Sequence, residues 1–330
     1  MDIKLLFALT LLLCFGLTAI LLRILIPILK SHKMGQKILD IGPRWHKSKE
    51  GTPTMGGIAF YIASLLVGGI AFAYAWKTNH LTNAPALLLT AAFALLNGVI
   101  GFLDDYTKFL KKQNAGLTAI QKYSLQFLLA SLYLAGMTAW GGLNTTLYIP
   151  FLNLHVELGY AYYLFAVILI TGIVNSVNLA DGIDGLCASE TAVVGAFFAI
   201  VAFTQGNASA SLLSALLIGS CLGFLTFNWH PARVFMGDTG SLFLGGCVVG
   251  LAFLIGSPAI VLICGFMYVL EAVSDILQVF WYKTKGKRLF LMAPIHHHFE
   301  KKGWGEVKIV TVFSLITLIL CTISYFGLSL

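Results

Sequence analysis

The sequence predicts an all-α protein that crosses a membrane about ten times. Of its 330 residues, 58% are hydrophobic and only 11% are charged, and the mean hydropathy is +0.87. A soluble domain carries roughly 25% charged residues, so about half of the usual polar coat is missing. Lipid must therefore surround most of the chain.

Apolar stretches of about 20 residues, the length needed to cross the hydrocarbon core, recur along the sequence. The first stretch is too long for the apolar part of a cleavable signal peptide and lacks a small-residue cleavage pattern, so we expect it to be retained. We treat residues 1–330 as a single integral membrane domain. The predicted spans are 3–28, 56–75, 84–103, 123–142, 161–179, 187–204, 210–228, 239–256, 259–281 and 307–327.

Lysine and arginine in the short connections predict the orientation, because they concentrate in cytoplasmic loops. Most of the 21 basic residues follow odd-numbered spans, such as Lys108 and Lys122 after the third. These loops are then cytoplasmic, and an even number of spans places both termini on the outer side. On that outer side, residues 144–160 suggest a small hairpin, although Pro150 argues against a regular strand.

Five aspartates lie where predicted spans meet cytoplasmic loops, in a chain with only 14 acidic residues. Carboxylates at a membrane boundary are costly, and by default they indicate a functional site. We therefore expect a site on the cytoplasmic face. The five are Asp104, Asp105, Asp181, Asp184 and Asp238.

Asp104 and Asp105 end the third span. Adjacent residues on a helix point about 100° apart, so we do not expect this pair to chelate one ion symmetrically. One carboxylate could face a cavity while the other meets a lysine or a helix end. The alternative is a pair of ordinary loop charges balanced by Lys108, Lys111 and Lys112.

A second polar cluster occupies residues 175–186. The spacing of Asn175, Asn178 and Asp181 puts them on one helical face, if the helix persists that far. This loop contains no lysine or arginine, so the carboxylates of Asp181 and Asp184 suggest a bound cation or donors from a ligand. The alternative is a plain Asp-Gly turn.

A third cluster, residues 227–241, combines Asn228, Arg233, the aromatic Phe235 and the acid Asp238 with glycine-rich backbone. Hard oxygen ligands suit Mg²⁺, which keeps several waters and usually bridges one or two carboxylates to substrate phosphate. A buried core aromatic is the alternative for Phe235.

Three consecutive histidines, His296, His297 and His298, lie between Pro294 and Gly303. A proline near the start and a glycine near the end fit a short helix. Consecutive side chains diverge around a helix, so a tris-histidine zinc site is not expected. Hydrogen bonding to phosphate or sugar fits this pattern better.

Together these motifs resemble the polyprenyl-phosphate N-acetylhexosamine-1-phosphate transferases, and among them the bacterial phospho-N-acetylmuramoyl-pentapeptide transferase family. No carboxyl or histidine position of that pattern is missing. The resemblance implies ten helices with outside termini, a bacterial plasma-membrane location and a homodimer. The matching segments are residues 51–57, Asp104-Asp105, Gln121-Lys122, residues 178–186, 235–241 and 296–300, and Gly303-Trp304.

The resemblance also implies the activity. The substrates would be UDP-N-acetylmuramoyl-pentapeptide and undecaprenyl phosphate, the products lipid I and UMP, and the cofactor Mg²⁺. Asp238 would contact the metal, Phe235 would stack on uracil, and Asp184 and Asn228 would contact the nucleotide. The other candidates are Lys49, Lys108, Lys122, Asn175, Asn178, Asp181, His296 and His298 for substrate binding, and Asp104, Asp105, Asp238 and His297 for catalysis.

Physical chemistry agrees with this reading. A lipid phosphate that attacks a diphosphate brings several negative charges together, so positioning, Mg²⁺ and lysine neutralisation should supply most of the catalysis. A phosphate monoester, with a second pKa of about 6, is largely ionised near neutrality. Asp104 as general base would remove any remaining proton. A rival scheme makes an aspartate a covalent nucleophile and needs two displacements; we favour single displacement.

Other functions fit less well. A relative that transfers N-acetylglucosamine-1-phosphate would share the aspartates and differ in the loop before the last span. A transporter would place acids near the bilayer midplane and show repeated halves. Glu271 and Asp275 are the only acids that we place well inside a span, and no halves match. A scaffold would not gather acids, amides and histidines at one face. Nucleic-acid binding would need a soluble basic face, whereas the net charge of +7 belongs to loops that face lipid head groups.

Overall fold

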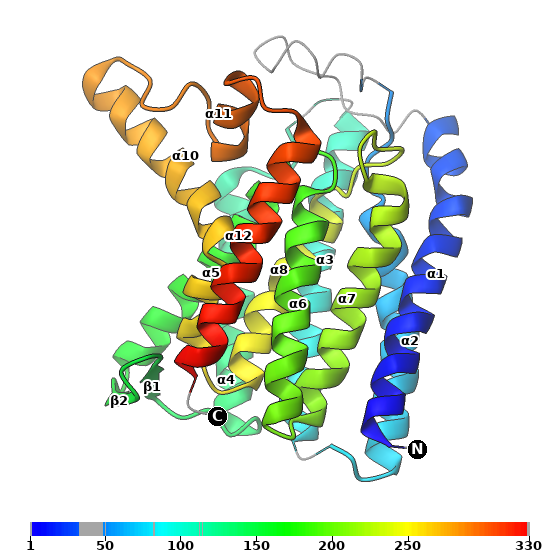
Figure 1. Cartoon of the computed structure of the whole chain (residues 1–330), viewed down its shortest axis with the longest axis vertical. Helices are drawn as coiled ribbons and strands as arrows, with labels where there is room; N and C mark the ends of the chain where they lie inside the picture. Colours follow the sequence, from blue (N-terminus) through cyan, green and yellow to red (C-terminus); the bar gives the residue numbers. More distant parts are fainter. Residues whose placement is uncertain are drawn as a thin grey trace.

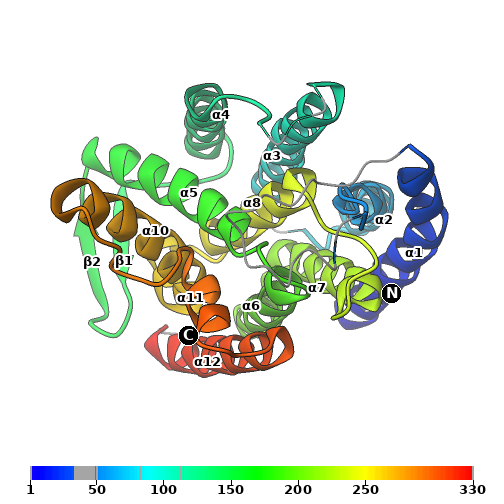
Figure 2. The same cartoon turned by 90° about the horizontal axis from the view of Figure 1, so that it is seen from above.

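Long helices packed side by side make up most of the protein (Figure 1). The computed structural model describes residues 2–32, 49, 51–81, 83–111, 113 and 115–328. The long helices are α1 (Ile3–Ser31), α2 (Gly57–Lys77), α3 (Ala84–Lys111), α4 (Ala119–Ala139), α5 (Ala161–Leu179), α6 (Leu186–Thr204), α7 (Ala208–Asn228), α8 (Asp238–Leu254), α10 (Phe266–Lys285) and α12 (Glu306–Gly327). Most of the long helices run roughly along the longest axis of the molecule, whereas α5 and α10 are inclined to it (Figures 1 and 2).

The predicted class, an all-α polytopic membrane protein, is confirmed. Within the described ranges, seven helices are long and apolar enough to cross a membrane, or eight if one bent pair counts as a span. Helix α8 is apolar but has only 17 residues, and α4 is not among the seven. The count of ten spans and the outside termini therefore stay predictions. Both chain ends lie at the same end of the bundle (Figure 1).

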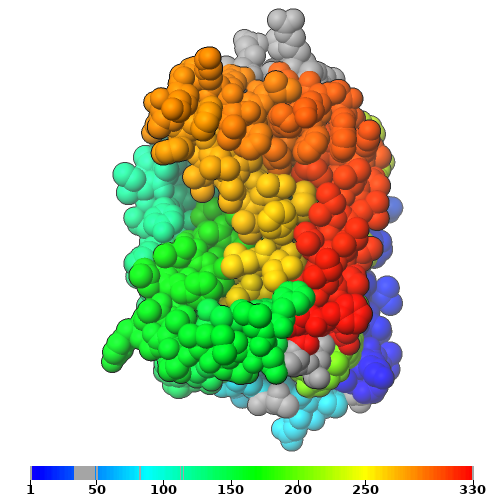
Figure 3. All heavy atoms as spheres, turned by 60° about the vertical axis from the view of Figure 1, so that its left-hand side comes forward, coloured from blue at the N-terminus to red at the C-terminus, as the bar shows by residue number. Residues whose placement is uncertain are grey.

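The predicted continuous span 259–281 is wrong in one respect, because the chain bends there by 79°. A short 3₁₀ turn, η2 (Pro258–Ile260), and α9 (Val261–Cys264) precede the break, and α10 follows it. Gly265 occupies the break, where an added Cβ would lie 2.7 Å from the carbonyl oxygen of Val261. Helix α10 thus leaves the bundle and leads to α11 (Ile295–Lys301), so that this arm overhangs one end of the molecule (Figures 1 and 3).

The predicted hairpin is present at the opposite end. Strands β1 (Thr146–Ile149) and β2 (Leu154–Glu157) pair antiparallel. Pro150 falls in the connection between them, so it does not interrupt either strand. The backbone N–H of Phe151 donates to the carbonyl oxygen of Gly327 at 2.8 Å, which fastens the hairpin to the end of α12.

Helix α8 lies in the middle of the bundle and is buried along nearly its whole length (Figure 2). Glycines permit its close approach to its neighbours. An added Cβ at Gly101 of α3 would lie 2.1 Å from the carbonyl oxygen of Asp238, and one at Gly57 of α2 would lie 2.5 Å from the Cα of Gly240. Small residues at helix crossings are a common way to pack helices in membranes. This packing holds the first turn of α8 against α3 and α2.

Gly101→Ala is expected to destabilise the protein, because the new methyl group would push α3 away from the first turn of α8. Overpacking a close contact costs about 1–3 kcal/mol. We expect a lower Tm in detergent, measured by intrinsic fluorescence, and reduced activity. Gly69→Ala in α2 is the matched control, since an added Cβ there meets nothing within 4 Å. Equal Tm values for the two variants would contradict this packing argument.

Candidate active site

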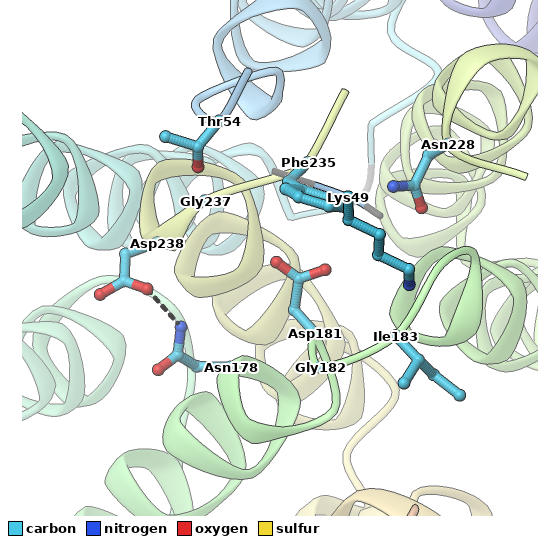
Figure 4. Close-up of a pocket in the computed structure, with 10 residues that line it drawn as sticks. All are labelled: Lys49, Thr54, Asn178, Asp181, Gly182, Ile183, Asn228, Phe235, Gly237 and Asp238. Carbon is cyan, nitrogen blue, oxygen red and sulfur yellow. Dashed lines mark hydrogen bonds between the residues drawn. The ribbon is translucent and has the colours of Figure 1, made fainter. Parts of the chain in front are cut away.

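A polar cavity of about 220 Å³ lies where the C-terminal ends of α5 and α7 meet the N-terminal end of α8 (Figure 4). This is the end of the bundle away from the hairpin. Several sequence-predicted site residues line the cavity, together with Thr54, Gly182, Ile183 and Gly237, which are not among the predicted site residues. The lining residues are Lys49, Thr54, Asn178, Asp181, Gly182, Ile183, Asn228, Phe235, Gly237 and Asp238.

Asp238, the first residue of α8, is the centre of the charged network. Its Oδ2 accepts hydrogen bonds from the ammonium groups of Lys122 at 2.9 Å and Lys108 at 3.2 Å. Its Oδ1 accepts from the side-chain amide of Asn178 at 3.0 Å. Three helices, α3, α4 and α5, thus converge on one carboxylate.

Asp104 and Asp105 have different hydrogen-bond partners, although an oxygen of one lies within 4.8 Å of an oxygen of the other. Both are only 3% exposed, so they are not ordinary loop charges. Asp105 accepts from the backbone N–H groups of Asp238 and Thr239 at 3.1 and 2.9 Å, and from the Thr239 hydroxyl at 2.8 Å. Asp104 pairs with Lys108 at 2.6 Å and accepts from the backbone N–H of Leu117 at 2.8 Å. Asp105 therefore meets a helix end, and Asp104 meets a lysine.

Three carboxylates in this network could hold a metal ion. Asp104, Asp105 and Asp238 each offer one oxygen, and these atoms lie within 4.8 Å of one another. Hard oxygen donors are what Mg²⁺ prefers, and substrate phosphate usually completes its coordination. The donor set therefore fits a divalent cation. The sequence prediction named Asp238 alone.

A second charged group surrounds Asp184, which is 2% exposed. Its Oδ1 accepts from Lys49 at 2.7 Å, and its Oδ2 accepts from the backbone N–H of Ala232 at 2.9 Å and lies 3.0 Å from His230 Nδ1. Lys49 also pairs with Glu306 at 2.6 Å. The absence of basic residues from the local loop was therefore misleading, because Lys49 reaches Asp184 from elsewhere in the chain. Glu306 was missed, although it too lies at a span boundary.

Asp181 behaves differently from Asp184. It lies in the turn after α5, and its carboxyl group points into the cavity (Figure 4). Burial raises the pKa of Asp181 well above its usual range, and the negative charges of Asp238 and Asp105 raise it further. A cation or a hydrogen-bond donor on a ligand would stabilise the ionised form. This remains the part of the 175–186 loop that is suited to a ligand.

The other two asparagine candidates, Asn175 and Asn228, form hydrogen bonds with other parts of the protein. Asn175 donates to the side chain of Gln126 at 2.7 Å, and it does not line the cavity. Asn228 lines the cavity, donates to the carbonyl oxygen of Val234 at 2.9 Å and accepts from the backbone N–H of Gly185 at 3.0 Å. Asn228 therefore holds together two loops that form the pocket.

Phe235 forms one wall of the cavity (Figure 4), rather than part of the apolar core. Its backbone fixes the ring in place, because its N–H donates to the carbonyl oxygen of Pro53 and its own carbonyl oxygen accepts from Gly56, both at 2.8 Å. An exposed aromatic face in a polar pocket is suited to stacking against a planar ring.

The three histidines lie on α11 and turn to different partners. His296 Nδ1 lies 3.0 Å from a carboxylate oxygen of Glu271, and His297 Nδ1 lies 2.6 Å from one of Glu300. His298 Nδ1 accepts from a nearby backbone N–H. None of these three residues lines the described cavity, and their contacts with substrate stay predictions.

A membrane bundle that holds carboxylates and lysines around a pocket with an aromatic wall defines a membrane-embedded enzyme for phosphorylated substrates. The family model of glycosyl transferase family 4 matches residues 86–256. Signature 1 of phospho-N-acetylmuramoyl-pentapeptide-transferase matches residues 49–60, which contain Lys49 and Thr54.

Proteins named phospho-N-acetylmuramoyl-pentapeptide-transferase are similar along nearly the whole chain. The protein from Clostridium botulinum (strain Eklund 17B / Type B) is 46% identical over 318 residues, 96% of this chain and 95% of its own. Those from Caldanaerobacter subterraneus subsp. tengcongensis and Caldicellulosiruptor bescii are 45% and 42% identical over 321 and 316 residues, 96% of this chain in both cases and 97% and 95% of their own. The chain belongs to the phospho-N-acetylmuramoyl-pentapeptide-transferase family, as its motifs predict.

Proposed function

We propose that the protein transfers phospho-N-acetylmuramoyl-pentapeptide from its UDP donor to undecaprenyl phosphate, giving lipid I and UMP. The observation that carries this proposal is the network around Asp238, in which two lysines and three carboxylates meet beside a pocket with an aromatic wall. Phosphoryl transfer needs such a concentration of positive charge and metal ligands, because little else of the chemistry falls to the protein.

The donor would occupy the cavity with its uracil against Phe235. Asn228 and Lys49 line the same pocket and would contact the nucleotide. Asp184 does not line the pocket and would act on the nucleotide through its ion pair with Lys49. Lys108 and Lys122 would then meet the diphosphate, because both ammonium groups already lie within 3.2 Å of Asp238. An ammonium group can exchange a carboxylate partner for a phosphate oxygen by a side-chain movement alone.

Mg²⁺ would be held by Asp238, with Asp104 and Asp105 as neighbouring oxygen donors. When bound, it would neutralise charge on the diphosphate oxygens. Asp105 would keep the start of α8 in place through its three hydrogen bonds. Asp104 would accept the remaining proton of the acceptor phosphate. The charged groups would thus be divided between binding, positioning and proton removal.

We favour single displacement over a covalent intermediate. An oxygen of the lipid phosphate attacks the β-phosphorus of the donor and forms a new P–O bond. The bond between the β-phosphorus and the bridging oxygen breaks, and UMP leaves with that oxygen. A covalent scheme needs an aspartate oxygen free to attack. Both oxygens of Asp105 accept hydrogen bonds from the start of α8, so we assign Asp105 a positioning role. Asp104 pairs with Lys108, and we propose that it acts as a base and not as a nucleophile, because an ionised lipid phosphate can attack the donor without a covalent intermediate.

The proposed setting is the bacterial plasma membrane, with ten spans, the site on the cytoplasmic side and both termini outside. The lysine-rich loops support this orientation. Donor nucleotide would enter from the cytoplasm, and the lipid acceptor from the surrounding bilayer. We also propose a homodimer, on the strength of family resemblance.

The choice of donor tests the function. UDP-N-acetylmuramoyl-pentapeptide should be used at least about 100-fold better than UDP-N-acetylglucosamine, because a site built for specific polar groups rejects analogues that lack them. The arm formed by α10 and α11 carries Lys283, Lys285, Lys287 and Arg288, which suit a peptide with free carboxylates.

The assay supplies purified protein in detergent with Mg²⁺, undecaprenyl phosphate and each donor, and measures release of UMP. Reactions without undecaprenyl phosphate provide the background. Comparable kcat/KM values for the two donors would instead assign the protein to the polyprenyl-phosphate N-acetylglucosamine-1-phosphate transferases.

Phe235→Ala is expected to weaken nucleotide binding by about 1–3 kcal/mol, the magnitude of base stacking on aromatic side chains. Isothermal calorimetry with UDP measures the change in Kd directly. The matched control is Phe326→Ala, which removes a ring that is 79% exposed at the far end of α12. Equal affinities of the two variants for UDP would remove Phe235 from the nucleotide site.

A further inference from the structure

Two carboxylates lie inside the helix bundle, away from the charged network of the pocket. Glu271 of α10 and Glu190 of α6 are each 1% exposed and interact electrostatically with each other. Both Glu190 oxygens and Oε1 of Glu271 have no hydrogen-bond partner within the described part of the chain. Sequence reasoning identified Glu271 and overlooked Glu190. Acids inside a membrane bundle are costly and indicate a functional role.

Glu271 contacts His296, and His296 lies next to a residue that lines the pocket. Its Oε2 lies 3.0 Å from His296 Nδ1 and 3.4 Å from the backbone nitrogen of the same residue. A histidine whose Nδ1–H donates to a carboxylate has a fixed ring orientation and, when neutral, leaves Nε2 without a hydrogen. Glu271 therefore determines where the other edge of the imidazole points.

The Nε2 edge of the His296 ring packs directly against Gly182. His296 is fully buried, and its Nε2 has no hydrogen-bond partner among the described residues. An added Cβ at Gly182 would lie only 2.2 Å from this nitrogen. Gly182 lines the cavity together with Asp181 and Ile183 (Figure 4). A single residue therefore separates the imidazole from the space that the donor would occupy.

We infer that Glu271 and His296 are positioning residues for the transfer reaction. Glu271 fixes the imidazole, and the imidazole supports the Asp181–Ile183 turn from behind, so that this turn keeps the shape of the donor pocket. The inference rests on the proposed function, because that function assigns the cavity to the donor. It differs from the sequence prediction for His296, which was direct hydrogen bonding to phosphate or sugar.

A cycle of variants at Gly182 and His296 separates these two roles. Gly182→Ala should collide with the ring and lower kcat/KM by about 100-fold, since a shift of about 1 Å at a binding site has effects of this size. Most of this loss should appear in the KM for the donor. His296→Ala removes the obstacle, so Gly182→Ala/His296→Ala should be at least about tenfold more active than Gly182→Ala alone.

The direct-contact reading gives a different result. If His296 acts on substrate, its removal lowers kcat, and the double variant shows the product of the two single losses or less. That outcome would overturn the inference. Gly172→Ala on α5 is the control for glycine replacement, because an added Cβ there meets nothing within 4 Å.

Variants of Glu271 test whether this residue fixes the imidazole of His296. Glu271→Gln keeps an oxygen that can accept from His296 Nδ1–H, so donor KM and the Kd for UDP should stay within about twofold of the wild-type values. Glu271→Leu removes the acceptor and should raise both by about tenfold. Equal donor affinities of Glu271→Leu and the wild type would overturn the positioning role of Glu271.

Two further observations keep the results interpretable. Tm values identify any Glu271 variant that fails to fold, and in that case the Gly182 and His296 cycle still tests the positioning role. If the wild-type protein releases no UMP, the proposed function fails. If it is active and the cycle is merely multiplicative, the positioning role alone fails.

Discussion

Asp238→Asn is expected to lower kcat by at least about 1,000-fold, the scale of removing a group that neutralises charge in a phosphoryl-transfer site. The carboxylate is the meeting point of Lys108, Lys122 and Asn178, and it is the common member of the proposed metal site. An amide keeps the shape of the side chain but removes its charge, so metal binding and lysine placement should both suffer. UMP release across a range of Mg²⁺ concentrations measures the effect.

The fold should survive this change, since the Asp238 side chain is 19% exposed at the edge of the pocket. An unchanged Tm together with lost turnover is the expected pattern. Glu157→Gln in the hairpin is the control for loss of one carboxylate at a distant position. Full activity of Asp238→Asn at low Mg²⁺ would show that this residue does not hold the metal.

Asp104→Asn is expected to retain donor binding and to lose transfer by about 100- to 10,000-fold, the usual range for removing a general base. Asp104 does not line the cavity, and its partners are Lys108 and the backbone of Leu117. The substitution should therefore leave the Kd for UDP nearly unchanged. Calorimetry with UDP and the UMP-release assay measure the two effects separately.

Comparison with Phe235→Ala tests this division of labour. Asp104→Asn should fail in transfer but not in binding, whereas Phe235→Ala should fail first in binding. If Asp104→Asn could not bind the donor and Phe235→Ala bound it normally, the two assignments would have to be exchanged.

The helices were predictable because length and apolarity are local properties of the sequence. The broken span was not, because Gly265 sits within an apolar run whose composition does not reveal a bend. The prediction also ended the third span at residue 103, whereas α3 continues to Lys111. Once the helix is longer, Lys108 comes one turn after Asp104 and pairs with it.

The sequence predicts which site residues lie at the same end of the bundle, but not which of them contact one another. Topology placed the aspartates on one face, but pairing depends on how helices pack. Lys49 meets Asp184 and Glu306 across 135 and 257 residues of sequence, a contact that no local pattern could indicate. The same reason explains why Asn175 turned to Gln126 of α4 instead of the cavity.

Lys108 and Lys122 have a further consequence through their shared partner Asp238. In the structure the charges of these two cations are already balanced, so they exert little long-range attraction on small anions in solution. A ligand must replace an internal counter-ion in order to bind them. On the proposed function, a ligand that carries a diphosphate would do so if a divalent cation were bound to the carboxylate. The resting network would thus act as an ion exchanger, which discriminates against inorganic phosphate and other simple anions before any sugar or base is recognised.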